Sequence, residues 1–209
     1  MVWAIENGDV LLEATLQHLA LVGQALAISL AIALPLGILA ARRPRLHGVV
    51  MALAGALYTV PALALFALLV PLMGLGQGPA LVAIVSYSLL VLTRNVAVAL
   101  REVPADILDA ADGMGFSRGR RLLRVELPLA APVILAGIRL TAVLQISVAT
   151  VAAFIGAGGL GDLIFQGITQ DHGDKVVAGA VAASLLAVAA DESLRRLETR
   201  LRLATGLAG

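Results

Sequence analysis

Few side chains in this chain of 209 residues have the types and spacing that an active site requires. Lys175 is the single lysine and directly follows Asp174, so the chain lacks the G-x-x-x-x-G-K-[ST] loop that holds the phosphates of a bound nucleotide. His18, His47 and His172 are far apart in the sequence, and there is no H-E-x-x-H pattern, no cysteine and no carboxylate cluster at ligand spacing. We therefore predict that the chain has neither a catalytic site nor a metal site and is not an enzyme.

A glycine pattern, G-x-G-x-x-G, occurs at Gly156, Gly158 and Gly161. A dinucleotide site with this pattern needs a strand before it and a helix after it, within a βαβ unit. Here the pattern follows a long apolar segment. We interpret the glycines as positions that let the chain bend at the outer membrane surface, with Phe154 and Phe165 as anchors nearby.

The most specific pattern is longer, and residues 109–128 read D-A-A-D-G-M-G-F-S-R-G-R-R-L-L-R-V-E-L-P. Small side chains at its start would let a short helix lie close against a partner protein. Asp106 and Asp109 favour the N-terminus of such a helix, and Gly115 can end it with a positive φ. The fixed positions of the pattern are Asp109, Ala110, Ala111, Gly115, Val125, Leu127 and Pro128.

This pattern resembles the cytoplasmic E-A-A-x3-G-x9-I-x-L-P loop of bacterial ABC-importer permeases, with Asp109 in place of Glu and Val125 in place of Ile. The resemblance implies a multi-pass subunit of the bacterial inner membrane with the type I importer fold. It also implies separate ATPase subunits that bind ATP and magnesium, with no cofactor on this chain. The remaining partners implied are a second permease, either a copy or a paralogue, and an extracytoplasmic substrate-binding protein. No nucleic acid is expected to bind.

Composition independently indicates a membrane protein. The chain is 60% hydrophobic and 14% charged, and its mean hydropathy is +0.97. A soluble domain of this length could not bury so much apolar surface. Hydropathy therefore predicts an all-α membrane protein with about five transmembrane helices of about 20 residues each. They are expected at residues 15–41, 49–72, 80–100, 129–155 and 176–194, with kinks at Pro35 and Pro61.

Basic residues gather on one side of these expected spans. They are Arg42, Arg43, Arg45, Arg101, Arg118, Arg120, Arg121, Arg124, Arg195, Arg196, Arg200 and Arg202. Because arginine and lysine mark cytoplasmic loops, we expect the N-terminus outside the cell and the C-terminus in the cytoplasm. This orientation places a coupling loop, residues 101–128, in the cytoplasm. Residues 1–209 are expected to form a single transmembrane permease domain.

Several polar residues fall inside the expected spans. A charge at the bilayer centre costs about 2.5–3.5 kcal/mol, so Arg139 is expected to line a protein interior or a dimer interface. Arg94 is expected either to line a protein interior or dimer interface as well, or to extend its side chain to the cytoplasmic surface. Tyr87, Arg139 and Gln145 are candidates for the translocation path, with hydrogen bonding between helices as the alternative.

Further segments are similar to the osmoprotectant branch of these permeases, which imports glycine betaine, choline, carnitine and related quaternary amines. They are Tyr58-Thr-Val-Pro61, Pro71-Leu-Met-Gly-Leu-Gly76, Arg94-Asn95 and the run from Phe154 to Asp162. The resemblance, over most of residues 15–195, implies ATP-driven import of such a quaternary amine with a binding protein. The alternatives are a permease for an amino acid or another small solute, and an ATP-independent secondary transporter.

Overall fold

The computed structural model describes residues 2–204, and all regular structure in that range is helical. Four helical stretches of this range are long and apolar enough to cross a membrane, and a bent helix pair makes up to five. The predicted all-α membrane fold is confirmed. In chain order the elements are α1 (Val2–Glu6), α2 (Gly8–Arg42), α3 (Pro44–Thr59), α4 (Ala62–Met73), α5 (Gln77–Arg101), α6 (Ala105–Gly113), α7 (Arg118–Arg121), the π-helical turn η1 (Leu122–Glu126), α8 (Leu127–Ala152), the 3-10 turn η2 (Ala153–Ile155), α9 (Leu160–Thr169) and α10 (Gly173–Ala204).

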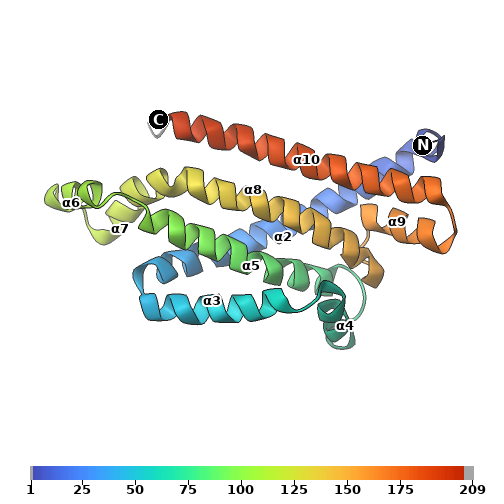
Figure 1. Cartoon of the computed structure of the whole chain (residues 1–209), viewed down its shortest axis with the longest axis horizontal. Helices are drawn as coiled ribbons and strands as arrows, with labels where there is room; N and C mark the ends of the chain where they lie inside the picture. The colour runs from blue at the N-terminus through green and yellow to red at the C-terminus, as the bar shows by residue number, and fades with distance from the viewer. Residues whose placement is uncertain (1, 205–209) are drawn as a thin grey trace.

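The long helices run side by side along the longest axis of the molecule (Figure 1). α5 is central and packs against α2 and α8, while α10 packs along α8 and α9. Small residues allow this close packing. Ala83 and Ala97 of α5 are fully buried. A Cβ on Gly37 of α2 would lie 2.5 Å from the Val96 side chain, and one on Gly137 of α8 would lie 2.6 Å from that of Asn95.

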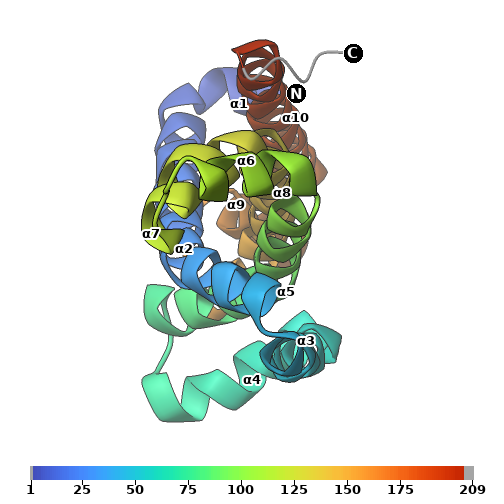
Figure 2. The ribbon, with the colours of Figure 1, turned by 90° about the vertical axis from the view of Figure 1, so that its left-hand side faces the viewer.

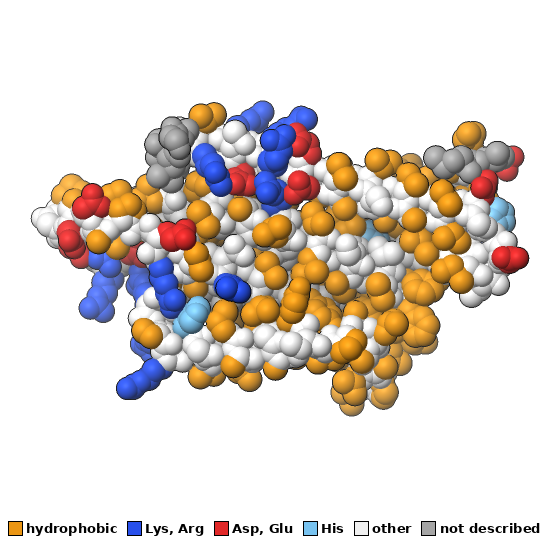
Figure 3. Space-filling view, viewed as in Figure 1, with side chains coloured by type: hydrophobic (Ala, Val, Ile, Leu, Met, Phe, Trp, Pro, Cys, Tyr) orange, Lys and Arg blue, Asp and Glu red, His pale blue; other side chains and the backbone are white. Residues whose placement is uncertain are grey.

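The two ends of the helix bundle differ in composition. α6 and α7 lie at the end where arginines gather, whereas α9 and the start of α1 lie at the other end (Figures 1 and 3). Figure 2 shows α6 and α7 crossing the end of the bundle. Between the ends, large apolar side chains such as Leu16, Leu53, Leu140 and Leu185 remain exposed. Such an extensive apolar surface suits contact with lipid rather than water.

The second expected span, residues 49–72, is not one helix. α3 and α4 meet at an angle of 94°. Pro61 has no N–H to donate and excludes helical backbone at Val60, which has φ −68° and ψ 127°. Pro61 thus breaks the helix rather than kinking it. Pro35, by contrast, lies within the continuous α2.

The fourth expected span begins earlier than the sequence indicated. The helical backbone starts at residue 118 rather than at residue 129, and it runs through α7, η1 and α8 without an intervening loop. The later part of the predicted 101–128 loop is therefore helical. Pro128 lies within this continuous helix, directly after the π-helical turn, instead of separating a loop from a helix.

The glycine pattern runs from the end of η2 into the first turn of α9, with no strand beside it in the described residues. Gly156, Gly158 and Gly159 have φ of 76°, 84° and 83°, so they make the bend that the sequence predicted. Phe154 and Phe165 flank the bend, and their ring centres lie 5.9 Å apart.

Candidate functional site

α6 contains the first part of the motif segment, which we define as residues 109–128. The helix follows Pro104, whose extended backbone precedes its first turn, and Asp106 lies in that turn. Asp109 and Ala110 are exposed, whereas Ala111 is buried. α6 thus presents a carboxylate and a small side chain outward, while Ala111 fixes the helix to the rest of the chain.

Gly115 ends this helix with a φ of 77°. The Phe116 N–H donates to the Ala111 carbonyl at 3.1 Å, and the Met114 N–H donates to the Ala110 carbonyl at 3.0 Å. These bonds satisfy carbonyls that a helix end otherwise leaves free. Gly115 is exposed, and an added Cβ would meet no atom within 4 Å. Position 115 therefore favours glycine because of its positive φ and not because a side chain would lack space.

The second part of the motif segment belongs to the helix that leads into the bundle. Leu127 is half-buried and packs with Val96, Leu100 and other apolar residues at the end of α5. Val125 is also half-buried, and Pro128 is exposed. The structure therefore divides the motif segment into an exposed helix end and a half-buried part that leads into the bundle.

A buried carboxylate joins the two parts of the motif segment. The Glu126 side chain is 9% exposed and lies 3.0 Å from the guanidinium of Arg121 and 3.5 Å from that of Arg42. Arg121 also contacts Asp112 of α6 at 2.5 Å. This ion-pair network was not predicted from the sequence, because residues five apart, such as Arg121 and Glu126, face different sides of a regular α-helix.

Of the three residues predicted for a translocation path, Tyr87 lies on α5, whereas Arg139 and Gln145 lie on α8. Gln145 is fully buried, and its Nε2 donates to Ser88 Oγ at 2.7 Å and to Ser29 Oγ at 3.1 Å. The buried Tyr87 hydroxyl donates to the Val60 carbonyl at the α3–α4 bend. Both residues thus make hydrogen bonds between helices, which was the alternative interpretation.

Arg139 joins α8 to the charged end of α10. Its guanidinium forms ion pairs with Asp191 at 3.1 Å and with Glu198 at 3.0 Å. This pairing compensates a positive charge that would otherwise be costly in an apolar span. Arg94, by contrast, is exposed and borders a cavity of about 570 Å³ with Tyr58 and Asn95.

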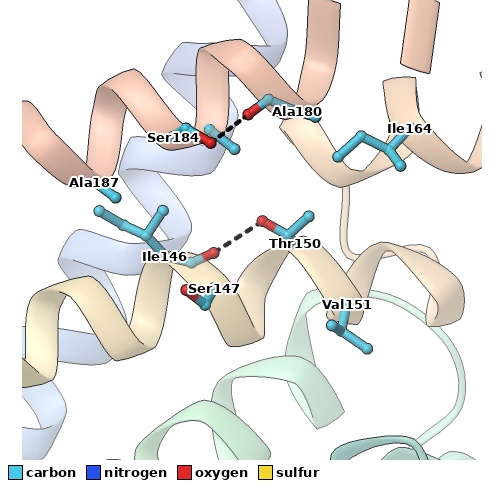
Figure 4. A pocket seen from close by; sticks show the side chains of 9 residues that line it. Ile146, Ser147, Thr150, Val151, Ile164, Ala180, Ser184 and Ala187 are labelled. Atoms are coloured by element: carbon cyan, nitrogen blue, oxygen red, sulfur yellow. Dashed lines mark hydrogen bonds between the residues drawn. The ribbon is translucent and has the colours of Figure 1, made fainter. Parts of the chain in front are cut away.

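Another cavity, of about 350 Å³, lies between α8, α9 and α10 (Figure 4). Its lining is mainly small and apolar, with a few hydroxyl groups. Those of Thr150 and Ser184 donate to the carbonyls of Ile146 and Ala180, four residues earlier, at 3.0 and 2.8 Å. The lining contains no acid, base or charged group. Residues 2–204 also contain no group of three or more side chains suited to a metal ion.

Comparisons with known proteins agree on one family. Residues 33–203 match the family described as "Binding-protein-dependent transport system inner membrane component". The carnitine transport permease protein OpuCB of Listeria monocytogenes is 40% identical over 94% of this chain and 90% of its own length. The choline transport system permease protein OpuBB of Bacillus subtilis is 38% identical, with coverages of 93% and 90%. For the osmoprotectant import permease protein OsmW of Salmonella typhimurium, the identity is 40% and both coverages are 95%.

The fold is similar to a solved inward-facing structure of the MetNI methionine ABC transporter. The TM-score is 0.84 at 22% identity, over 92% of this chain and 96% of that one. The chain therefore belongs to the family of binding-protein-dependent transport system inner membrane components, and its relatives are permease subunits of osmoprotectant importers.

Proposed function

We propose that residues 1–209 form one permease domain of an ATP-driven, binding-protein-dependent importer for a small quaternary amine such as glycine betaine, choline or carnitine. The main support is similarity over more than nine-tenths of the chain to permeases named for carnitine, choline and osmoprotectants. The exposed end of α6, with Asp109, Ala110 and Gly115, suits docking onto an ATPase. In this proposal ATP and magnesium bind to that ATPase, and this chain hydrolyses nothing.

The mechanism we propose is alternating access between two permease chains. ATP-driven closure of the ATPase subunits would draw the two α6 helices together, and the attached long helices would rock between inward- and outward-facing packings. A substrate-binding protein would dock at the opposite end, around residues 74–79 and 156–174. By favouring one packing, docking would raise the ATPase rate.

Substrate selectivity is proposed to reside mainly in the binding protein. Recognition of a quaternary ammonium group commonly uses several aromatic rings, yet aromatic residues make up only 3% of this chain. Tyr58 and Tyr87 form an edge-to-face pair with ring centres 5.9 Å apart, and the Tyr87 hydroxyl is already bonded to the backbone. Two such rings suit a path of low affinity.

Transport can be tested in proteoliposomes that contain the complete complex, with binding protein and labelled substrate on one side and ATP on the other. We expect glycine betaine, choline or carnitine to accumulate only with ATP, and ATP hydrolysis to rise when loaded binding protein is added. Accumulation driven by an ion gradient without ATP would contradict the mechanism. ATP-dependent uptake of an amino acid but of no quaternary amine would remove the substrate assignment alone.

We also propose that the end of the bundle with α6 faces the cytoplasm and that the end with α9 faces outward, because arginines gather at the α6 end. The chain has no native cysteine, so His172→Cys, Ser117→Cys and Arg196→Cys each give a single label site. An impermeant thiol reagent should label position 172 in intact cells, and positions 117 and 196 only after permeabilisation. The opposite pattern would reverse the orientation and remove α6 from reach of a cytoplasmic ATPase.

A further inference from the structure

Glu126 is a buried carboxylate shared by arginines from two different parts of the chain. Arg42 is the last residue of α2, and Arg121 precedes the π-helical turn that leads into α8. Their guanidinium groups lie 3.5 and 3.0 Å from the Glu126 oxygens. Arg121 extends the network to Asp112 on α6. One carboxylate therefore links three segments that are separate in the sequence.

The π-helical turn makes this arrangement possible. In an α-helix, residues five apart differ in direction by about 140°, so Arg121 and Glu126 would face different sides. In η1 the Leu127 N–H donates to the carbonyl of Leu122, five residues earlier. This wider turn brings the side chains of Arg121 and Glu126 onto one face. Single π turns within α-helices are frequent at functional sites.

The ion-pair network of Glu126 lies between α6 and the long helices α2 and α8. α6 is short and packs only lightly on α7 and η1. The Asp112–Arg121 ion pair adds a polar link from α6 to the helix that continues as α8. The Glu126–Arg42 ion pair extends this link to α2. At the same end, Arg101 of α5 donates to the Ala40 carbonyl at 2.7 Å, which joins α5 to the end of α2.

We propose that Glu126 is a positioning residue that makes α6, the end of α2 and the start of α8 move as one body. When an ATPase displaces α6, this body transfers the displacement to both long helices together. The inference rests on the proposed function, because it presupposes that α6 receives mechanical work. Glu126 does not touch substrate or nucleotide; it acts through Arg42 and Arg121.

The test compares Glu126→Gln, which removes the charge at nearly constant shape, with Glu126→Asp, which keeps it. Arg42→Gln is a second variant at a partly exposed position, and it breaks only the link to α2. Glu192→Gln is the matched control, because the ion pairs of Glu192 in residues 2–204 are with Arg195 and Arg196, both on its own helix α10. Each complete complex is purified and reconstituted, and three quantities are measured: ATPase subunits per permease, ATP hydrolysed, and substrate transported.

We expect Glu126→Gln and Arg42→Gln to keep the full subunit ratio and to hydrolyse ATP within about twofold of the wild type. Substrate transported per ATP should fall at least fivefold, with the apparent KM for loaded binding protein unchanged. Glu126→Asp should keep more than half of the substrate transported per ATP by the wild type. Glu192→Gln should transport as much substrate per ATP as the wild type.

The proposal is wrong if both neutral variants keep the wild-type transport per ATP. It is also wrong if transport and hydrolysis fall in proportion, or if the ATPase subunits dissociate, because Glu126 would then only support folding or assembly. A wild-type complex that shows no ATP-dependent uptake would instead overturn the proposed function, and the role of Glu126 with it.

Discussion

Replacing Gly115 with valine should lower ATP-driven uptake more than fivefold while the membrane helices stay folded. A β-branched residue is poorly tolerated at the φ of 77° found here. Left-handed backbone costs a non-glycine residue about 1–2 kcal/mol, which is roughly a 5- to 30-fold loss of the native turn. Because the site is exposed and spacious, no core packing is lost. The change should therefore alter how α6 meets the ATPase and little else.

Gly119→Val provides the matched control for this prediction. Gly119 is exposed, has helical backbone within α7, and leaves the same free space for a Cβ. Uptake, ATP hydrolysis and subunit ratio should be measured for both variants in purified complexes. If Gly115→Val transports as well as Gly119→Val, the turn after α6 is not part of the coupling element.

Gly161→Ala should destabilise the folded chain by about 3 kcal/mol, enough to cause a large loss of monodisperse protein after extraction in detergent. A Cβ at position 161 would lie 2.1 Å from the Thr150 carbonyl oxygen and 2.6 Å from the Ala153 Cβ. The carbonyl belongs to the backbone of α8 and cannot rotate away, so α9 must move off α8. Overpacking of this kind commonly costs about 1–3 kcal/mol, and backbone contacts fall at the upper end.

Gly173→Ala is the control for this second prediction, because Gly173 begins α10 at the same end of the bundle and a Cβ there meets nothing within 4 Å. Thermal unfolding in one detergent should show a much lower midpoint for Gly161→Ala and almost no change for Gly173→Ala. Equal midpoints would mean that α9 adapts to the extra methyl group without cost.

The features that the sequence predicted are those set by local chemistry. Long apolar segments predicted the membrane helices, because each segment must satisfy its own backbone hydrogen bonds in lipid. Gly115 was expected to end a helix with a positive φ, and it does. The glycines at 156 and 158 were expected to bend the chain, and they do so between two helices.

The features that escaped the sequence analysis depend on contacts between distant segments. Pro35 and Pro61 were both expected to kink their helices, but only the helix at Pro61 breaks, so a proline alone does not predict which of the two occurs. No sequence pattern marks a π-helical turn. The sequence therefore did not indicate that Arg121 and Glu126 would form an ion pair. Gln145 stood out as polar within an apolar span, but its partners, Ser29 and Ser88, lie on two other helices. The roles predicted for the coupling and translocation-path residues stay predictions.

The right-angled break after α3 has a consequence for the surrounding lipid. With 16 residues, α3 is about 24 Å long, shorter than a hydrocarbon core of about 30 Å. α4 then turns across the bundle axis with Leu68 and Leu72 largely exposed. Where α3 and α4 meet lipid, this short hydrophobic height favours a thinner bilayer than the 35-residue α2 does. Hydrophobic mismatch on this side would make the stability of the folded permease depend on the acyl-chain length of the surrounding lipid.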